Sequence, residues 1–392
     1  MNIPDDLAFD LAEYESRRAL VQTALRERGI DVLLVTSPSN TCWLTGFVAS
    51  WYPPRLPVGV AIWADDGRRV FFDWTRHREF LPYGALYDEA EFVDYGTSHE
   101  EVAEQLARRS PGAKVALEWA SPTPSSSVIL PLAAELRRRG IDVVDGDWIV
   151  DTLRLAKSPA EQDRMRRAGR IADATFRALP GHLRLGMTEL EVAALVTTLM
   201  SEKGGEVPAQ HPLVASGPSA WREVHGFPSG RRLERGDIVS VDASAVVDRY
   251  HVNLSRVFSI GADNAAAAEM MDAAAQSLRV LCDTARLGKD PAPAMDAAEA
   301  ALRARVPAEN IWWTGGYAVG ISFPPSWVGH AYLANDGPTR IRLDEGYTSN
   351  FESILSDRAN ECEAAAIDTV MMTADGLVSL SGLPRELVVV EV

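Results

Sequence analysis

The chain has 392 residues, of which 46% are apolar and 24% are charged, and it carries a formal net charge of −16. This length is comfortable for two domains, and the composition is that of a folded globular protein rather than a disordered one. The acidic balance argues against a nucleic-acid partner, because phosphate binding needs clustered Lys and Arg.

The cysteines and the apolar runs bear on the class of protein and on its location. Cys42, Cys282 and Cys362 lie far apart and without paired spacing, which disfavours a disulfide framework and a thiolate zinc site. The N-terminal MNIPDDLAFDLAEYE lacks the basic and apolar regions of a leader, and no apolar run approaches the ~20 residues that span a bilayer. We therefore expect a cytoplasmic protein with no membrane partner.

The chain has few lysines, and their positions indicate whether a cofactor could bind through a Schiff base. None of the lysines lies at the end of an apolar strand, the setting of a Schiff-base lysine, so pyridoxal-type and aldolase-type chemistry are disfavoured. The lysines are Lys114, Lys157, Lys203 and Lys289. We expect no organic cofactor.

Residues 1–155 predict a small α/β domain. Two apolar runs, 58–63 and 68–73, flank the turn Asp65-Asp66-Gly67 and predict a hairpin. The other expected elements are a helix at 12–29, strands at 31–36, 114–118 and 141–146, and a helix at 128–139.

Residues 156–392 predict an α+β domain in which helices cover one mixed sheet. Ser158 with Glu161, and Thr188 with Glu191, have the spacing of capping boxes at two helix starts. The second of these helices is expected to end at Gly204. The further expected elements are helices at 264–286 and 292–305, a hairpin at 237–260, and strands at 347–354 and 364–373.

Four stretches carry residue types suited to catalysis or binding. Glycines in the third allow close backbone approach, and its aromatic residues supply apolar walls. The stretches are 211–230 with Arg222 and His225, 236–256 with Asp242 and Asn253, 312–327 with Tyr317, Phe323 and Trp327, and 346–355 with Glu352.

Eight motifs in order resemble the pita-bread family, which contains prolidase, aminopeptidase P, methionine aminopeptidase, creatinase and ectoine hydrolase. The resemblance covers nearly the whole chain. It implies a ribonuclease-H-like N-terminal domain of the creatinase type, a pita-bread C-terminal domain, and a homodimer in which the N-terminal domain borders the partner's active site. The motifs are NTCWLTGF (40–47), LRLAKSPAE (153–161), VASGPSAWREVH (214–225), LERGDIVSVD (233–242), RYHVNLSR (249–256), GGYAVG (315–320), LDEGYTSNFE (343–352) and AIDTVMMTADG (366–376).

The metallopeptidases of this family bind two metal ions through two Asp, one His and two Glu. The resemblance places these ligands on Asp242, Asn253, Tyr317, Glu352 and Ile367, so three of the positions have changed type. Two carboxylates cannot neutralise two divalent ions, and an isoleucine offers no lone pair. The resemblance therefore implies a former metal site, and we expect no metal.

The same departures resemble the metal-free branch of the family. Creatinase opens a ureido C–N bond with a histidine in the segment that matches His225, and ectoine hydrolase opens a cyclic amidine through a carboxylate at the position of Asp242. GYAVGISFPPSW and RYHVNLSR resemble ectoine hydrolase, whereas Glu352 fits creatinase better. The carboxylate that matches the one in ectoine hydrolase is Asp rather than Glu, so the resemblance does not identify the substrate.

Three residues are the catalytic candidates. We expect His225 to transfer protons, Asp242 to attack carbon or bind a cationic amidinium, and Glu352 to bind a cation or donate a proton beside it. The structural alternatives are a loop histidine, a hydrogen-bonded inner-sheet carboxylate and an edge-strand surface residue, respectively.

Substrate binding has six candidates, each with a packing or surface role as its alternative. Aromatic side chains could surround a cation, an arginine could clamp a carboxylate, and an amide or phenol could hydrogen-bond substrate. The candidates are Tyr317, Asn253, Trp327, Phe323, Arg222 and Trp51.

These residues predict a metal-independent hydrolase of a non-peptide C–N bond in a small amino-acid-like substrate, such as a cyclic amidine, guanidino or ureido compound. Two alternatives remain open at this point. One is a metal-free lyase or ring-forming biosynthetic enzyme on the same fold, and the other is a degenerate binding protein for a small cation. A proline-directed peptidase is the least favoured, because the ligands for its water-activating metals have changed.

Overall fold

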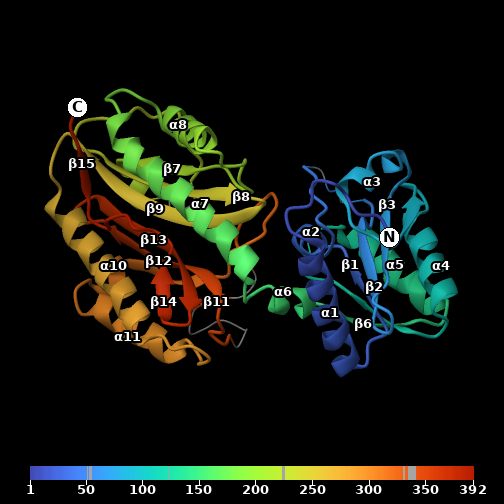
Figure 1. Cartoon of the computed structure of the whole chain (residues 1–392). Helices are drawn as coiled ribbons and strands as arrows, with labels where there is room; N and C mark the ends of the chain where they lie inside the picture. Colours follow the sequence, from blue (N-terminus) through green and yellow to red (C-terminus); the bar gives the residue numbers. More distant parts are fainter. Residues whose placement is uncertain (51, 53–54, 122, 223–225, 330–331, 334–340) are drawn as a thin grey trace. The chain divides into compact units, whose positions relative to one another are not determined.

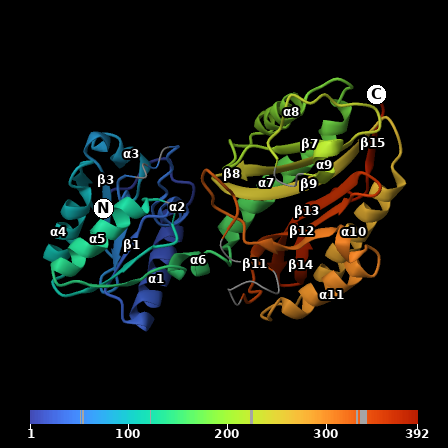
Figure 2. The same cartoon turned by 180° about the vertical axis from the view of Figure 1, so that it is seen from behind.

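The computed structural model describes residues 1–50, 52, 55–121, 123–222, 226–329, 332–333 and 341–392. The chain divides into two compact units, Met1–Arg154 and Leu155–Val392 (Figures 1 and 2). The first is an α/β unit, and the second has helices packed on a large mixed sheet, which confirms the expected fold class. Among the described residues, no helix is long and apolar enough to cross a membrane.

The first unit is built on a six-stranded sheet in the order β4-β3-β2-β1-β5-β6. Its central strand, β1, is buried along its whole length, pairs in parallel with β5 and pairs antiparallel with β2. The strands are β1 (Val32–Val35), β2 (Gly59–Trp63), β3 (Arg69–Trp74), β4 (Glu89–Val93), β5 (Lys114–Leu117) and β6 (Asp142–Asp145). The helices are α1 (Leu11–Arg28), α2 (Pro38–Thr45), α3 (Leu81–Gly84), α4 (Ser98–Arg109), α5 (Ser126–Arg138) and α6 (Ile149–Leu153).

The expected hairpin of this unit is present as β2 and β3, with Gly67 at φ 72° in its turn. Five elements, α2, α3, β4, α4 and α6, were not among the expected ones. The helix α4 buries Val102, Ala103 and Leu106 within a charged sequence, so its apolar stripe is narrow.

The second unit contains a nine-stranded sheet in which β11-β10-β12-β13-β9-β8-β7 follow one another, while β14 pairs with β13 and β15 with β9. Its strands are β7 (Leu213–Ser216), β8 (Ile238–Val247), β9 (Tyr250–Ile260), β10 (Ile311–Tyr317), β11 (Tyr332–Leu333), β12 (Thr348–Asp357), β13 (Cys362–Thr373), β14 (Gly376–Ser379) and β15 (Val388–Val390). Its helices are α7 (Pro159–Ala178), α8 (Glu189–Glu202), α9 (Pro218–Arg222), α10 (Ala265–Thr284) and α11 (Ala292–Arg303). Both expected capping boxes are formed, at the starts of α7 and α8.

Helices cover one face of this sheet and leave polar side chains on the other. Val239, Val241, Ala243 and Ala245 of β8 belong to the apolar core shared with α7 and α8. Because side chains alternate along a strand, Asp242 lies on the opposite face. The helices α10 and α11 cover β12 and β13 in the same way. The polar face is therefore where a site can form.

β8 and β9 are joined by a two-residue turn, since Val247 pairs with Tyr250. Both turn residues, Asp248 and Arg249, have positive φ, of 49° and 65°, as a type I′ turn requires. Neither is glycine. Arg249 is held in place by donating from Nη1 to the Val207 carbonyl at 2.8 Å. The turn fixes the register of the two strands that carry Asp242 and Asn253.

A buried ion pair joins β9 to β13. The two strands share only two paired positions, Ile367 with Ser255 and Asp368 with Leu254. Asp368 is 1% exposed and forms ion pairs with Arg256 of β9 at 3.1 Å and with Arg385 at 2.9 Å. Arg256 also donates to the Ile367 carbonyl at 3.1 Å. This cluster reinforces a short junction between the two halves of the sheet.

We expect Asp368→Ala to lower the free energy of unfolding by about 3–5 kcal/mol, because it leaves the buried Arg256 guanidinium without its anionic partner. Denaturant unfolding measures the loss. Asp344→Ala is the control, since its ion pair with Arg342 is exposed and worth about 1 kcal/mol or less. Equal losses in the two variants would contradict the proposed reinforcement.

Candidate active site

One row of paired residues crosses five strands on the polar face of the second unit. Asp242 of β8 pairs with Ser255 of β9, and Ser255 pairs with Ile367 of β13. Ile367 pairs with Glu352 of β12, which in turn pairs with Gly315 of β10. The sheet register therefore gathers segments that are far apart in the sequence.

A chain of hydrogen bonds connects the two carboxyl groups in this row. Asn253 donates from Nδ2 to Asp242 Oδ1 at 2.6 Å. Asn350 donates from Nδ2 to Glu352 Oε1 at 2.6 Å and to Asn253 Oδ1 at 3.2 Å. The Asn350 oxygen accepts from the backbone N–H of Tyr317 at 2.7 Å. These partners fix the orientation of both amides, so that each directs an N–H at a carboxyl group.

Both carboxyl groups hold their protons more tightly than usual. Desolvation by the surrounding protein raises the pKa of Asp242 to about 7, and the hydrogen bond from Asn253 opposes this rise. Burial raises the pKa of Glu352 to about 8, and the nearby charge of Asp242 adds to it. Hydrogen bonds from Tyr317, Asn350 and Trp313 act in the opposite direction. The pair therefore shares protons near neutral pH, as an acid and base in one site can.

Tyr317 and Trp327 form one wall beside Glu352. Trp327 is 2% exposed and donates from Nε1 to the Tyr317 hydroxyl at 3.2 Å. Burial raises the pKa of Tyr317 well above its usual value, and the charges of Glu352 and Asp242 raise it further. The phenol therefore stays protonated and can donate to Glu352.

The other candidate binding residues lie differently. The Phe323 ring packs against the guanidinium of Arg249, 5.2 Å from its centroid, so that face already has a cation from the protein. Arg222 is exposed and stacks over Trp221, with its Cζ 4.4 Å from the ring centroid. Trp51 and His225 lie outside the described residues.

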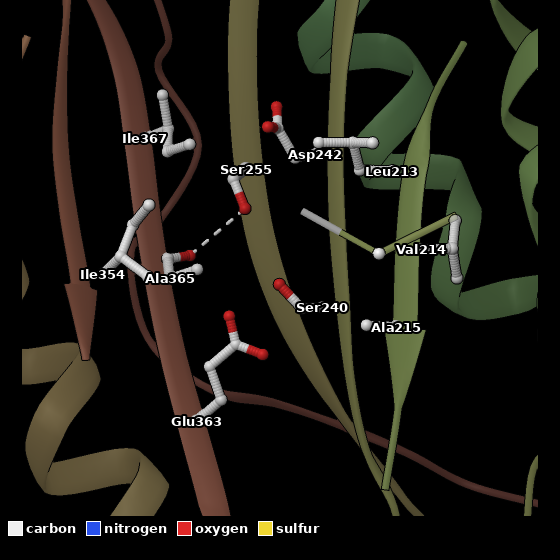
Figure 3. Close-up of a pocket in the computed structure, with 11 residues that line it drawn as sticks. Leu213, Val214, Ala215, Ser240, Asp242, Ser255, Ile354, Glu363, Ala365 and Ile367 are labelled. Carbon is white, nitrogen blue, oxygen red and sulfur yellow. Dashed lines mark hydrogen bonds between the residues drawn. The ribbon is translucent and has the colours of Figure 1, made fainter. Parts of the chain in front are cut away.

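A pocket opens next to Asp242 on the same face (Figure 3). It holds about 390 Å³ of empty space, part of it open to solvent. Its lining residues are Leu213, Val214, Ala215, Gly226, Ser240, Asp242, Ser255, Ile354, Glu363, Ala365 and Ile367. Gly226 follows His225 directly in the chain, so the first described residue after the candidate histidine borders this pocket.

Three polar residues of this face were not among the candidates from the sequence. They are Asn350, which connects the two carboxyl groups, and Ser240 and Glu363, which line the pocket. The alternation of side chains along a strand could have indicated them, because residues an even number of positions apart lie on the same face. Asn350 is two positions from Glu352, and Ser240 is two from Asp242. Glu363 is four positions from Ile367.

Family models match most of the chain. The model described as metallopeptidase family M24 matches residues 163–374, and the creatinase/prolidase N-terminal domain matches residues 17–156. The chain belongs to metallopeptidase family M24. The two matches show that the fold is the expected pairing of a creatinase-type N-terminal domain and a pita-bread domain.

Relatives within family M24 are hydrolases. The chain is 27% identical to the probable dipeptidase PepE of Mycobacterium tuberculosis and 24% identical to the ectoine hydrolase of Halomonas elongata, each over 98% of both chains. The solved structure of dipeptidase PepE from Mycobacterium ulcerans superposes with a TM-score of 0.80 at 26% identity, covering 97% of this chain and 99% of the other. The family and these relatives support a hydrolase.

The metal pair of an M24 peptidase does not fit the residues at this site. Asn253 directs an N–H donor, not a lone pair, at Asp242. Ile367 has no donor atom, and Tyr317 keeps its proton. Among the described residues, no group of three or more His, Cys, Asp or Glu could hold an ion.

We expect Glu352→Gln to stabilise the protein increasingly as pH rises. The pKa of Glu352 is raised to about 8 in the folded protein, so folding disfavours its ionised form. The resulting cost is absent below about pH 4 and grows to about 4 kcal/mol at pH 8. The gain in melting temperature over the unsubstituted protein should therefore be larger at pH 8 than at pH 5.

The exposed Glu361→Gln is the matched control and should show no such trend. A gain for Glu352→Gln that is the same at both pH values would show that burial does not disfavour the ionised carboxylate.

Proposed function

We propose that this M24 protein hydrolyses a non-peptide C–N bond in a small amino-acid-like substrate without a metal ion. The substrate class is a cyclic amidine, guanidino or ureido compound. The observation that carries the proposal is the Asn253–Asp242 hydrogen bond, because an amide N–H occupies the place where a metallopeptidase needs a second anionic ligand.

Asp242 and Glu352 have complementary roles in this proposal. Ionised Asp242 acts at the electrophilic carbon, either as nucleophile or by binding the positive charge next to it. Protonated Glu352 donates to the nitrogen that leaves as the C–N bond breaks. Water then supplies the oxygen of the new C–O bond, and its protons restore Glu352 and complete the product. The apolar walls strengthen these charge interactions by limiting solvent.

Two further residues complete the proposed machinery. His225 transfers the proton of the attacking water, a role that rests on the family resemblance. The Tyr317 phenol, oriented by Trp327, donates to Glu352 or to the substrate. The similarity to ectoine hydrolase over 98% of the chain supports this class of reaction.

The similarity to probable dipeptidases supports a competing candidate, a metal-dependent dipeptidase, and one assay separates the two. Ectoine, creatine and the dipeptide alanylproline are incubated with purified enzyme before and after EDTA, and after addition of Mn²⁺ or Zn²⁺. We expect C–N hydrolysis of a non-peptide substrate that EDTA leaves unchanged. Stoichiometric metal in the purified protein, with activity lost on chelation and restored by Mn²⁺ or Zn²⁺, would overturn the proposal.

Solvent labelling separates hydrolysis from elimination or ring closure. In water enriched in ¹⁸O, hydrolysis places one labelled oxygen in the product, whereas a lyase places none. In a single turnover with enzyme in excess, label recovered in Asp242 instead of the product identifies Asp242 as the nucleophile, because water then opens the ester at the Asp242 carbonyl carbon and the product leaves with an Asp242 oxygen.

We expect kcat/KM to depend on pH as a bell with limbs near pH 7 and pH 8. Activity rises as Asp242 ionises, with its pKa of about 7, and falls as Glu352 loses its proton, with its pKa of about 8. Asp242→Asn should lower kcat by at least about 10³, and Glu352→Gln should remove the alkaline limb. An unchanged profile in Glu352→Gln would contradict its role as the acid.

A further inference from the structure

Glu363 of β13 is a buried carboxyl group that lines the pocket and has one oxygen to which no described residue donates a hydrogen bond. It is 5% exposed, and its Oε2 has no hydrogen-bond partner among the described residues. The neighbouring Ser240 hydroxyl opposes the rise in the pKa of this carboxyl group. Figure 3 shows the Glu363 side chain extending from β13 toward Ser240 on β8.

Packing alone does not account for this residue. A buried polar atom without a partner costs about 1–3 kcal/mol, and more when the group is charged. Burial raises the pKa of Glu363 to about 8, with the charge of Asp242 adding to the rise. A glutamine, or the alanine found at neighbouring positions of CEAAAID, would avoid this cost. A ligand group that donates an N–H to Oε2 would offset it.

The pocket has the acidic side chains and the shape to select such a ligand. Its described lining contains two carboxyl groups, Asp242 and Glu363, and two hydroxyl groups, with no Lys, Arg or His among them. Leu213, Ile354 and Ile367 supply apolar sides. The empty space of about 390 Å³ includes the open mouth of the pocket, and a water molecule takes about 30 Å³ of it. A delocalised cation with N–H donors on several edges matches this lining, because carboxylates accept such donors side by side.

We propose that Glu363 determines substrate specificity by accepting an N–H from a guanidinium or amidinium group bound between β8 and β13. This inference rests on the proposed function for the adjacent bond cleavage at Asp242, and it narrows the substrate class from any C–N compound to a cationic one. Neutral ureido compounds are bound more weakly, since they bring the same shape but no charge to two acidic side chains.

A pair of matched probes tests the proposal by binding alone. Methylguanidinium chloride and methylurea have nearly the same shape and differ in charge. Their dissociation constants are measured by calorimetry or ligand-detected NMR for the full chain and for Glu363→Gln, Glu363→Asp and the exposed control Glu361→Gln. We expect the unsubstituted protein to prefer the cation at least tenfold, Glu363→Gln to lose this preference, and Glu361→Gln to keep it.

Glu363→Asp retains the acidic group but shortens the side chain by one methylene, so we expect an intermediate preference for the cation. This result would separate an effect of charge from a loss of folding. Equal affinity for the two probes in the unsubstituted protein, or an unchanged preference in Glu363→Gln, would overturn the proposal.

Turnover distinguishes a failure of this inference from a failure of the proposed function. If the cation binds in a Glu363-dependent way but no C–N compound is hydrolysed, the pocket assignment holds and the hydrolase proposal fails. If a guanidino or amidine substrate is hydrolysed and Glu363→Gln leaves its KM unchanged, the hydrolase proposal holds and the role of Glu363 fails. When both are correct, Glu363→Gln raises KM at least tenfold and changes kcat less.

Discussion

The hydrogen bond from Asn253 to Asp242 is the constraint on which the rest of the site depends. An aspartate at position 253 would place a second negative charge next to Asp242, and a bound cation or a shared proton would have to relieve the repulsion. An asparagine supplies a proton donor instead, so the protein satisfies Asp242 by itself. Asn350 continues the same pattern to Glu352, and two acids become linked by two amides. In the proposed function the site works with protons, because its carboxyl groups have pKa values close to neutrality.

The register of the sheet explains how residues so distant in sequence reach one place. Each strand contributes side chains alternately to the helix-covered face and to the polar face, and paired positions bring β8, β9, β13, β12 and β10 into one row. The two-residue turn at Asp248 and Arg249 fixes the first of these pairings. A shift of one residue would turn Asp242 into the apolar core, which makes the alternative register costly.

Local signals in the sequence are sufficient for much of the fold. The capping boxes at Ser158 and Thr188 and the β8–β9 hairpin each follow from a few neighbouring residues, and each is present. The site is harder, because hydrogen bonds such as that between Asn350 and Asn253 join residues 97 positions apart. Glu363 looks like a surface glutamate at the start of a strand, and only the pairing of β13 with its neighbours buries it. Phe323 is an aromatic residue of the kind that binds cations, but its ring already packs against the Arg249 guanidinium. Neighbouring residues in the sequence do not indicate this contact.

The junction between β9 and β13 has a consequence for substrate choice. Asp242 and Asn253 lie on strands on one side of this junction, and Glu352 and Glu363 lie on strands on the other side. The Asp368–Arg256 pair crosses this junction beside two backbone pairings, and so it reinforces the spacing between Asp242 and the two glutamates. In the proposed function, this spacing sets the width of the reacting group that can contact the acids on both sides of the junction.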